Sequence, residues 1–221
     1  MAKTGYLLRH IIDRCEAGAC MSGSLAPVRR VIYCHRGSVA LSDGGHLEAD
    51  EAWFGTGAIA VEAGAAGAVL WRYELDADDA EPHLLTDPGF KSELTVSEAL
   101  DGPDPSDDWI LRCDSVKFPM GGMAFRHVHQ GPGIRVLREG QIQIKTKGET
   151  HTFLPGQAWF EAGPDPVVAT ASELECTKFV RVMVLPEELK GKSSIQYINP
   201  EDFDKPKTQR YKGYVDEPID H

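Results

Sequence analysis

The sequence predicts an all-β protein made of two tandem β-barrels, with little helix. Two observations predict this class. First, the chain contains an internal repeat, in which residues 31–75 and 136–185 carry Gly, Trp, Phe and Arg in the same order. Second, both copies consist of short alternating or β-branched runs separated by Gly and Pro, which is typical of antiparallel sandwiches and barrels.

The repeat consists of three matching segments in each copy. The first copy has VIYCHRGSVAL, EAWFGTG and VLWRYEL, and the second has VLREGQIQI, QAWFEAG and FVRVMVL. The aligned pairs are Gly37 with Gly140, Trp53 with Trp159, Phe54 with Phe160, Gly57 with Gly163, and Arg72 with Arg181. Ordered matches of this kind indicate a duplicated domain. Because the tryptophans and Arg72/Arg181 recur in both copies, we expect them to be structural, the arginines for example in ion pairs.

Each copy is expected to form strands joined by tight turns. Residues 141–145 (QIQIK) alternate polar and apolar, which is the signature of a half-buried strand. Residues 151–161 predict two strands around a Pro-Gly turn, and residues 177–185 (TKFVRVMVL) predict a strand rich in β-branched side chains. The best candidates for helix are residues 5–16 and 96–100.

We expect four parts along the chain. They are a first barrel at residues 1–90, an acidic connector at 91–108, a second barrel at 109–187 and a tail at 188–221. The connector is expected because residues 76–108 are rich in Asp, Glu and Pro, a composition typical of solvated linkers. The tail contains several aromatic residues, so it is expected to pack on the barrels or on a dimer partner.

The composition argues against several classes of partner. A net charge of −11 disfavours nucleic acid and anionic membranes, since both attract positive surfaces. No stretch approaches the ~20 apolar residues of a membrane span, and the N-terminus lacks the apolar core of a signal peptide. Five scattered cysteines fit reduced thiols in a cytoplasmic protein. A homodimer is the default expectation, because barrel edges are often paired.

The strongest chemical signal is the pair His127 and His129 in the segment GGMAFRHVHQGPGIRVLREGQI, residues 121–142. On a strand, residues two positions apart point to the same face. Two imidazoles that converge inside a barrel suit a divalent metal ion. The alternative is a pair of hydrogen-bonded histidines that line an apolar barrel.

This segment resembles the first motif of the cupin superfamily, in which a Gly is followed after five residues by His-x-His. Gly121 and His127 have this spacing, and residues 154–166 (LPGQAWFEAGPDP) resemble the second motif. The resemblance covers about residues 25–75 and 110–185. It implies two cupin-type jelly-roll barrels in one chain, a bicupin. Cupins with metal sites are often dioxygenases, so it also points towards that activity.

The chain departs from the cupin pattern at two of the four usual metal ligands. The Glu expected after the second His is replaced by Gly133 or Ile134, and the His of the second motif is replaced by Pro166. In the first copy, Ser24 and Ala26 stand where the second copy has its two histidines. The first barrel is therefore expected to be a degenerate, structural copy.

A working metal site needs a third protein ligand, and Glu161 is our first choice. The second motif lies near the first in this kind of barrel, and the first copy, which lost the histidines, has Gly55 at the matching position. The alternative for Glu161 is a surface carboxylate beside a turn. The expected cofactor is a divalent ion, Fe, Mn, Zn or Ni. The weaker ligand candidates are Glu175, His151 and Gln130.

Arg135 is the best candidate for an anchor of an anionic substrate, because guanidinium groups bind carboxylates bidentately. The first copy has Ile32 at the matching position. The alternative is a solvent-facing arginine.

Three functions remain open from these residues. The first is a metal-dependent cupin enzyme, dioxygenase-like, which acts on a small organic acid or aromatic compound. In it His127, His129 and Glu161 hold the metal, and Arg135 steers the anion. The second is a metal-free isomerase or epimerase that uses one of the histidines as general base. The third is a non-catalytic bicupin that binds a small molecule.

Overall fold

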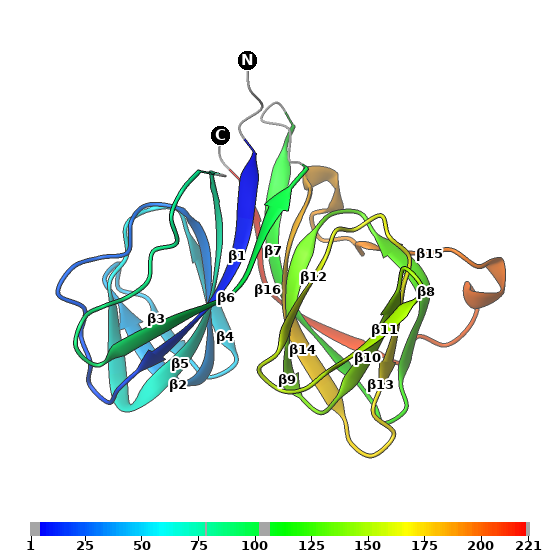
Figure 1. Ribbon diagram of the computed structural model, residues 1–221, viewed down its shortest axis with the longest axis horizontal. Helices are drawn as coiled ribbons and strands as arrows, with labels where there is room; N and C mark the ends of the chain where they lie inside the picture. Colours follow the sequence, from blue (N-terminus) through cyan, green and yellow to red (C-terminus); the bar gives the residue numbers. More distant parts are fainter. Residues whose placement is uncertain (1–4, 78, 102–106, 220–221) are drawn as a thin grey trace. The chain divides into compact units, whose positions relative to one another are not determined.

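The computed structural model describes residues 5–77, 79–101 and 107–219 (Figure 1). These residues are mostly strand, and their helix is limited to two short 3-10 turns, η1 (Glu187–Leu189) and η2 (Pro200–Asp202). No helix in this part of the chain has the length and hydropathy of a membrane span. The chain divides into two compact units, residues 1–103 and 104–221. The predicted all-β class with little helix is confirmed.

The first unit is built on one antiparallel sheet of six strands. Its order is β3-β2-β5-β1-β6, and β4 pairs with β2. The long strands β2 and β5 shift register twice along their pairing, and such bulges bend strands so that one sheet can curl around a core. The bounds are β1 (Tyr6–Cys15), β2 (Arg29–Leu41), β3 (His46–Glu48), β4 (Glu51–Gly55), β5 (Val61–Ala77) and β6 (Phe90–Leu100).

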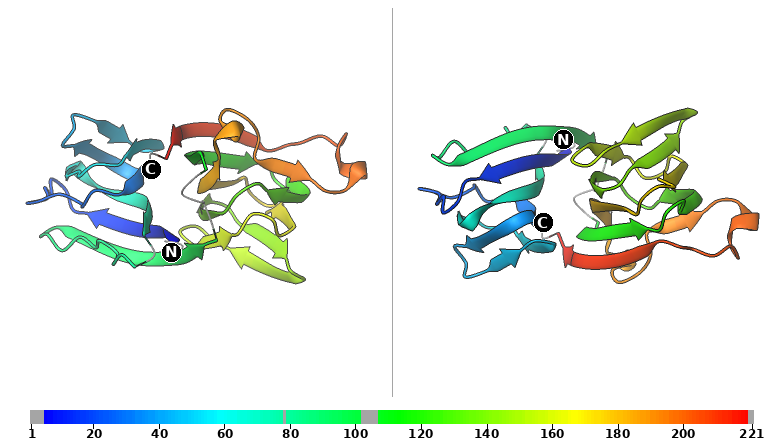
Figure 2. Two further views of the ribbon diagram at one scale, coloured as in Figure 1. Left: turned by 90° about the horizontal axis from the view of Figure 1, so that it is seen from above. Right: turned by 90° about the horizontal axis from the view of Figure 1, so that it is seen from below.

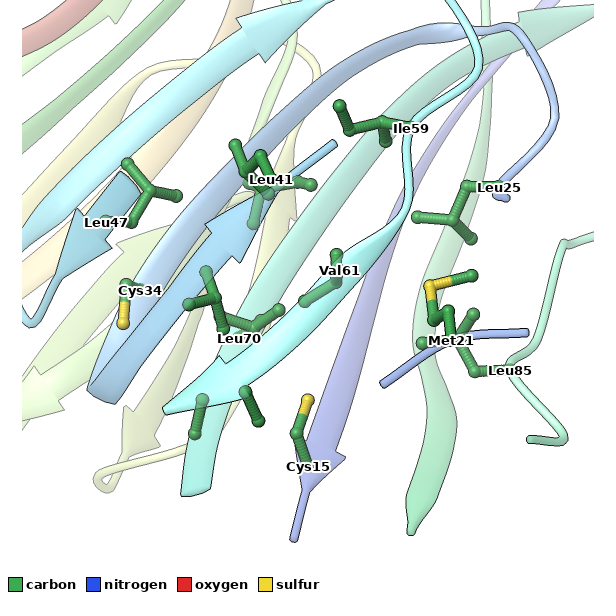
Figure 3. Packing of buried hydrophobic residues seen from close by; sticks show 14 residues of the cluster. Cys15, Met21, Leu25, Cys34, Leu41, Leu47, Ile59, Val61, Leu70 and Leu85 are labelled. Atoms are coloured by element: carbon green, nitrogen blue, oxygen red, sulfur yellow. The ribbon is translucent and has the colours of Figure 1, made fainter. Parts of the chain in front are cut away.

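The core of the first unit combines an apolar cluster with buried ion pairs. Figure 3 shows the cluster, in which Leu25, Ile59 and Leu70 pack between the strands. The ion pairs centre on Arg72, whose guanidinium donates to Asp13 at 2.6 and 3.0 Å and to Glu74 at 2.6 Å. Each of these buried charges has a partner of opposite charge, so no ligand is needed to balance the charges of this network.

The second unit is a double-sheet jelly roll. One sheet has the order β11-β10-β13-β8-β15, and the other has the order β12-β9-β14-β7-β16. The bounds are β7 (Trp109–Phe118), β8 (Met123–His129), β9 (Gly133–Glu139), β10 (Ile142–Thr146), β11 (Glu149–Phe153), β12 (Ala158–Glu161), β13 (Val167–Ala171), β14 (Thr177–Pro186), β15 (Ile195–Tyr197) and β16 (Arg210–Pro218).

The C-terminal tail forms part of the second barrel. Strand β15 pairs with β8, and strand β16 pairs with β7 along most of its length. In Figure 2 the red strand β16 runs beside the green strand β7. The tail therefore packs on its barrel through backbone pairing, and it adds an edge strand to each of the two sheets.

Strand pairing supports the alignment of the two copies. In each unit, three strands place corresponding residues side by side in the same order. These residues are Trp53, Ile32 and Arg72 in the first unit, and Trp159, Arg135 and Arg181 in the second. The repeat seen in the sequence thus corresponds to a repeat of strand register.

The two segments favoured for helix are strands, so that expectation is wrong. Residues 6–15 form β1, and residues 96–100 lie in β6, which pairs with β1. Strand β1 is buried on both faces along most of its length. A strand buried on both faces lacks the alternation of period two, and its sequence then resembles that of a buried helix.

The segment expected as a connector also differs from a simple linker. Of residues 91–108, the first ten belong to strand β6 of the first sheet. Residues 102–106 lie outside the described residues. The polar side chains of β6, among them Lys91, Glu93 and Glu98, fit its position at the edge of the sheet, where one side is open to solvent.

Candidate functional site

His127 and His129 end strand β8 and point into the second barrel, as their spacing predicts. Their residues are only 3% and 5% exposed. The two Nε2 atoms lie 3.3 Å apart, and the rings meet edge to face with centroids 4.8 Å apart. The interior of this barrel therefore contains two imidazoles whose Nε2 atoms face each other.

The hydrogen bonding of His127 decides which of its nitrogens carries the proton. Its Nδ1 lies 2.6 Å from the carbonyl oxygen of Phe125, and a carbonyl oxygen can only accept. Nδ1 is therefore the protonated nitrogen of the neutral ring, and Nε2 presents a lone pair to the interior. Burial lowers the pKa of His127 below its usual value, which keeps the ring neutral at pH 7.

His129 is the central residue of the group. Its Nε2 lies 3.3 Å from the Nε2 of His127 and 3.3 Å from Oε2 of Glu161. Burial, together with the nearby charge of Arg135, lowers the pKa of His129 to about 3. The neutral ring donates its Nε2 proton toward these two acceptors. Its Nδ1 is buried without a hydrogen-bond partner among the described residues.

Glu161, on strand β12, is a buried carboxylate with a partner on each oxygen. Trp159 Nε1 donates to its Oε1 at 2.8 Å, and Arg135 Nη2 lies 2.9 Å from its Oε2. Burial by itself would raise the pKa of Glu161. The charge of Arg135 and the hydrogen bonds from His129 and Trp159 outweigh it and hold that pKa well below its usual range. Glu161 is thus ionised inside the barrel, and it is not a surface carboxylate.

Arg135 is also buried, with 1% of its surface exposed, so the solvent-facing alternative is wrong. Besides its ion pair with Glu161, it donates from Nη1 to the carbonyl of Gly133 at 2.6 Å. Burial lowers the pKa of Arg135 to about 10, which still leaves it charged at pH 7. Its Nη1 is hydrogen-bonded within the protein, and its Nη2 pairs with Glu161 by charge, without the alignment of a hydrogen bond.

Arg181 and Asp114 form a second buried ion pair beside this group. Arg181 donates to Asp114 from Nε at 2.7 Å and from Nη2 at 3.1 Å, a bidentate arrangement. The arginine that recurs in both copies is therefore paired with a buried carboxylate in each unit.

No protein-family model matches this sequence, and no curated protein matches it either. Solved structures do resemble the fold. A deletion mutant of Bacillus subtilis oxalate decarboxylase OxdC matches with a TM-score of 0.65 at 12% identity, over 93% of this chain and 78% of that one. A Trp-to-Phe variant of the same enzyme gives 0.65 at 12% identity, over 94% and 79%.

AerE from Microcystis aeruginosa matches with a TM-score of 0.57 at 10% identity, over 81% of this chain and 88% of that one. Coverages of 81–94% of this chain mean that these matches include residues of both barrels. The fold is a bicupin. Identities this low establish the fold alone, so chemistry must be argued from this chain's own residues.

The bicupin site is closed in this structure. The space enclosed by the two histidines, Arg135, Glu161 and the surrounding apolar side chains is about 20 Å³. That is enough for about one water molecule. A substrate of several heavy atoms enters only if part of the wall moves.

The other ligand candidates lie away from this group. His151 is on strand β11, is exposed and pairs with Glu149. Glu175 and Gln130 are exposed as well. Tyr211, one of the aromatic residues of the tail, also lines the enclosed space, a position that no motif in the sequence indicates.

The expected metal ligands fit a divalent ion in part. Ligands bound at about 2.1 Å in adjacent positions lie about 3.0–3.4 Å apart, and both measured separations, His127 to His129 and His129 to Glu161, are 3.3 Å. In the observed positions, however, no group of three or more His, Cys, Asp or Glu among the described residues is arranged to hold a metal ion. Arg135 Nη2 lies 2.9 Å from Glu161 Oε2, so a metal ion bound here would share this carboxylate with the guanidinium.

Proposed function

We propose that the second barrel is a metal-dependent enzymatic site for a small organic acid or aromatic compound. His127 and His129 are its first two metal ligands, and Glu161 is the third. The observation that carries the proposal is the 3.3 Å approach of the two Nε2 atoms, with His127 anchored through its other nitrogen. Metal-ligating histidines usually donate that second N–H to a carbonyl or carboxylate.

The charge state of the site also supports this assignment. Both rings have lowered pKa values, so both are neutral at pH 7 and neither repels a metal cation. Glu161 is ionised, which makes it a ligand that needs no deprotonation. Binding through His129 Nε2 requires only that its proton move to Nδ1, which now has no hydrogen-bond partner among the described residues.

A bound Fe, Mn, Zn or Ni ion would supply Lewis-acid polarisation or oxygen activation at an open coordination position. The chain's own residues would bind and orient the substrate around it. Arg135 keeps Glu161 ionised, and the Arg181–Asp114 pair places a second guanidinium at the same wall.

A metal-free enzyme is the second candidate, and one observation favours it. Arg135 already neutralises Glu161 at 2.9 Å, so the buried site balances its charge without a metal ion. In this case His127, whose Nε2 carries the inward lone pair, would be the general base.

Metal content decides between the two. The purified, tag-free chain is analysed by elemental mass spectrometry, as isolated and after reconstitution with each of the four ions. The variants are His127→Ala, His129→Ala and their double, with His151→Ala as the matched control, because His151 is an exposed histidine outside the site. Circular dichroism establishes that each variant is folded.

We expect near-stoichiometric metal in the wild type and in His151→Ala, and none in the double variant. Metal that survives in the double variant would contradict the ligand assignment. A wild type that takes up no metal under any of the conditions would exclude the metal-dependent proposal. The general-base candidate would then be tested by loss of activity in His127→Ala.

A further inference from the structure

A second hollow meets the closed histidine site from outside. It has a volume of about 370 Å³ and lies between strands β7, β14 and β16 and the loop before β15. Arg181 and Tyr211 line this hollow and also line the enclosed space around the histidines. These two side chains therefore form a wall common to both spaces.

Of these two, Arg181 is fixed in place. Its strand β14 is central in its sheet, paired with β7 on one side and β9 on the other. Its guanidinium is buried and bonded twice to Asp114. Displacing it would leave the Asp114 carboxylate without its bidentate partner in a buried position, which is costly.

Tyr211 is the side chain that can move. It lies on β16, the edge strand of the sheet, and it is 50% exposed. It stands opposite Val116, which lines the enclosed space, and its ring lies 5.7 Å from the guanidinium carbon of Arg181. The pairing of β16 shifts register between Gly213 and Val215, so this edge strand is less tightly constrained than a central one.

The charges of the outer hollow define what it accepts. Three cations line it, Arg112, Arg181 and Lys192, and two carboxylates, Asp114 and Asp216. Arg181 pairs with Asp114, and Arg112 pairs with Asp216. Three positive charges against two negative ones leave an excess of +1, which belongs to Lys192.

The remaining lining of this hollow is uncharged and comes from Tyr211, Val215, two serines and two glycines, namely Ser193, Ser194, Gly191 and Gly213. A pocket with a mainly apolar wall and a single unbalanced cation suits an organic monoanion with an apolar or aromatic body. The hollow of about 370 Å³ also lies in the size range of small-molecule sites.

We propose that this outer hollow is the entrance and recognition site for the histidine centre, that it receives an organic monocarboxylate with an apolar body, and that Tyr211 is the gate between the two spaces. The proposal rests on the second barrel being a small-molecule site, as argued above. It assigns to the tail strand β16 a role in controlling access, which no motif in the sequence indicates.

The gate is tested by chemical access to the histidines. The full chain, freed of metal with EDTA, is treated with diethyl pyrocarbonate, which acylates unprotonated imidazole nitrogens. The rates at His127 and His129 are followed by peptide mass spectrometry in wild type, Tyr211→Ala, Tyr211→Phe and Tyr214→Ala. Tyr214 is a matched control, because it is a tyrosine of the same strand that lines neither space.

We expect Tyr211→Ala to raise both rates at least about tenfold, since removing the ring removes the opening step. Tyr211→Phe keeps the ring and should keep the wild-type rate, as should Tyr214→Ala. Equal rates in wild type and Tyr211→Ala would overturn the gate, and so would an equal rise in Tyr214→Ala. Buried His10 lines neither space and should stay unreactive in every variant, which verifies that none has unfolded globally, and exposed His46 normalises the reagent.

The ligand class is tested by protection. Millimolar benzoate should slow acylation of His127 and His129, the neutral analogue benzamide should not, and Lys192→Gln should abolish the effect of benzoate. Equal protection by benzoate and benzamide would overturn the assignment of an anion. These readouts do not depend on metal, so they separate failure of the gate from failure of the metal-dependent proposal.

Discussion

Arg135 Nη2 lies 2.9 Å from Glu161 Oε2 inside the second barrel, and both side chains are buried. The corresponding residues of the first barrel are Ile32 and Gly55, which carry no charge. One copy of the repeat thus keeps a buried ion pair next to two histidines, while the other copy fills the equivalent positions without one. Substituting the uncharged residue of the first barrel into the second therefore measures what the pair contributes to stability.

Removing one member of this pair should destabilise the chain strongly. Arg135→Ile leaves the Glu161 carboxylate buried without its cation, and we expect a loss of about 3–5 kcal/mol in the free energy of unfolding. Arg135→Ile combined with Glu161→Gln removes both charges and should regain most of that loss. Urea unfolding of the two single variants and the double variant measures the coupling. Additive effects would mean that the pair does not interact.

The ion network of the first barrel should be structural and independent of the histidine site. Arg72 donates to Asp13, to Glu74 and to the carbonyl of His83. Arg72→Met should therefore cost about 3–5 kcal/mol, measured by urea unfolding. The exposed Arg14 is the control, and Arg14→Met should change stability by less than about 0.5 kcal/mol.

The Arg72→Met variant also tests whether the first barrel contributes to the metal site. If the first barrel is a structural copy, folded Arg72→Met should bind as much metal as the wild type. A proportional loss of metal in the folded protein would show that the first barrel takes part in the site.

Buried His10 should make the protein less stable in acid. Burial, with a smaller effect of Arg72, lowers the pKa of His10 to about 3, whereas the unfolded chain titrates near 6.5. Below pH 6.5 the unfolded state binds a proton that the folded state does not. The folded state therefore loses about 1.4 kcal/mol per pH unit from this group between pH 6.5 and about 3. Above pH 6.5 the group contributes no pH dependence.

This effect is measured by urea unfolding between pH 7.5 and 4.5 for the wild type, His10→Gln and the exposed-histidine control His46→Gln. The slope of stability against pH should become shallower in His10→Gln and stay unchanged in His46→Gln. Identical slopes in the wild type and His10→Gln would contradict a depressed pKa for His10.

The repeated glycine of the duplicated domain should be intolerant of a side chain. Gly140 has φ +76°, and a Cβ there would lie 2.4 Å from the carbonyl oxygen of Cys176. Gly148 has a similar φ of +84° but no atom within 4 Å of such a Cβ. Gly148→Ala should cost about 1–2 kcal/mol from backbone strain alone, and Gly140→Ala about 1–3 kcal/mol more from the clash.

Thermal unfolding of the two variants measures this difference directly. Gly37 occupies the matching position of the first copy, with φ +73°, and a Cβ there would lie 1.9 Å from the carbonyl oxygen of Gly67, closer still than the contact at Gly140. Gly37→Ala should therefore behave like Gly140→Ala. Equal costs for Gly140→Ala and Gly148→Ala would show that the close contact is relaxed at no cost.

Much of the fold could be predicted from the sequence, because it depends on patterns that are local or repeated. Five ordered matches indicated the duplication, and strand register places Trp53 and Trp159 at equivalent positions. The spacing of His127 and His129 fixed their common face, because side chains on a strand alternate with a period of two. The sequence of strand β1 favours helix because burial on both faces hides that period.

What surrounds the histidines was decided by tertiary structure. Strand parity gives the face of a residue but not its neighbours across the barrel. The approach of Glu161 to Arg135 and His129 depends on which strands pair, and the hydrogen-bonded partners in this barrel are far apart in sequence. The tail shows this most clearly. Only its pairing with β7 brings Tyr211 to the wall of the site, about 80 residues after the histidines it covers.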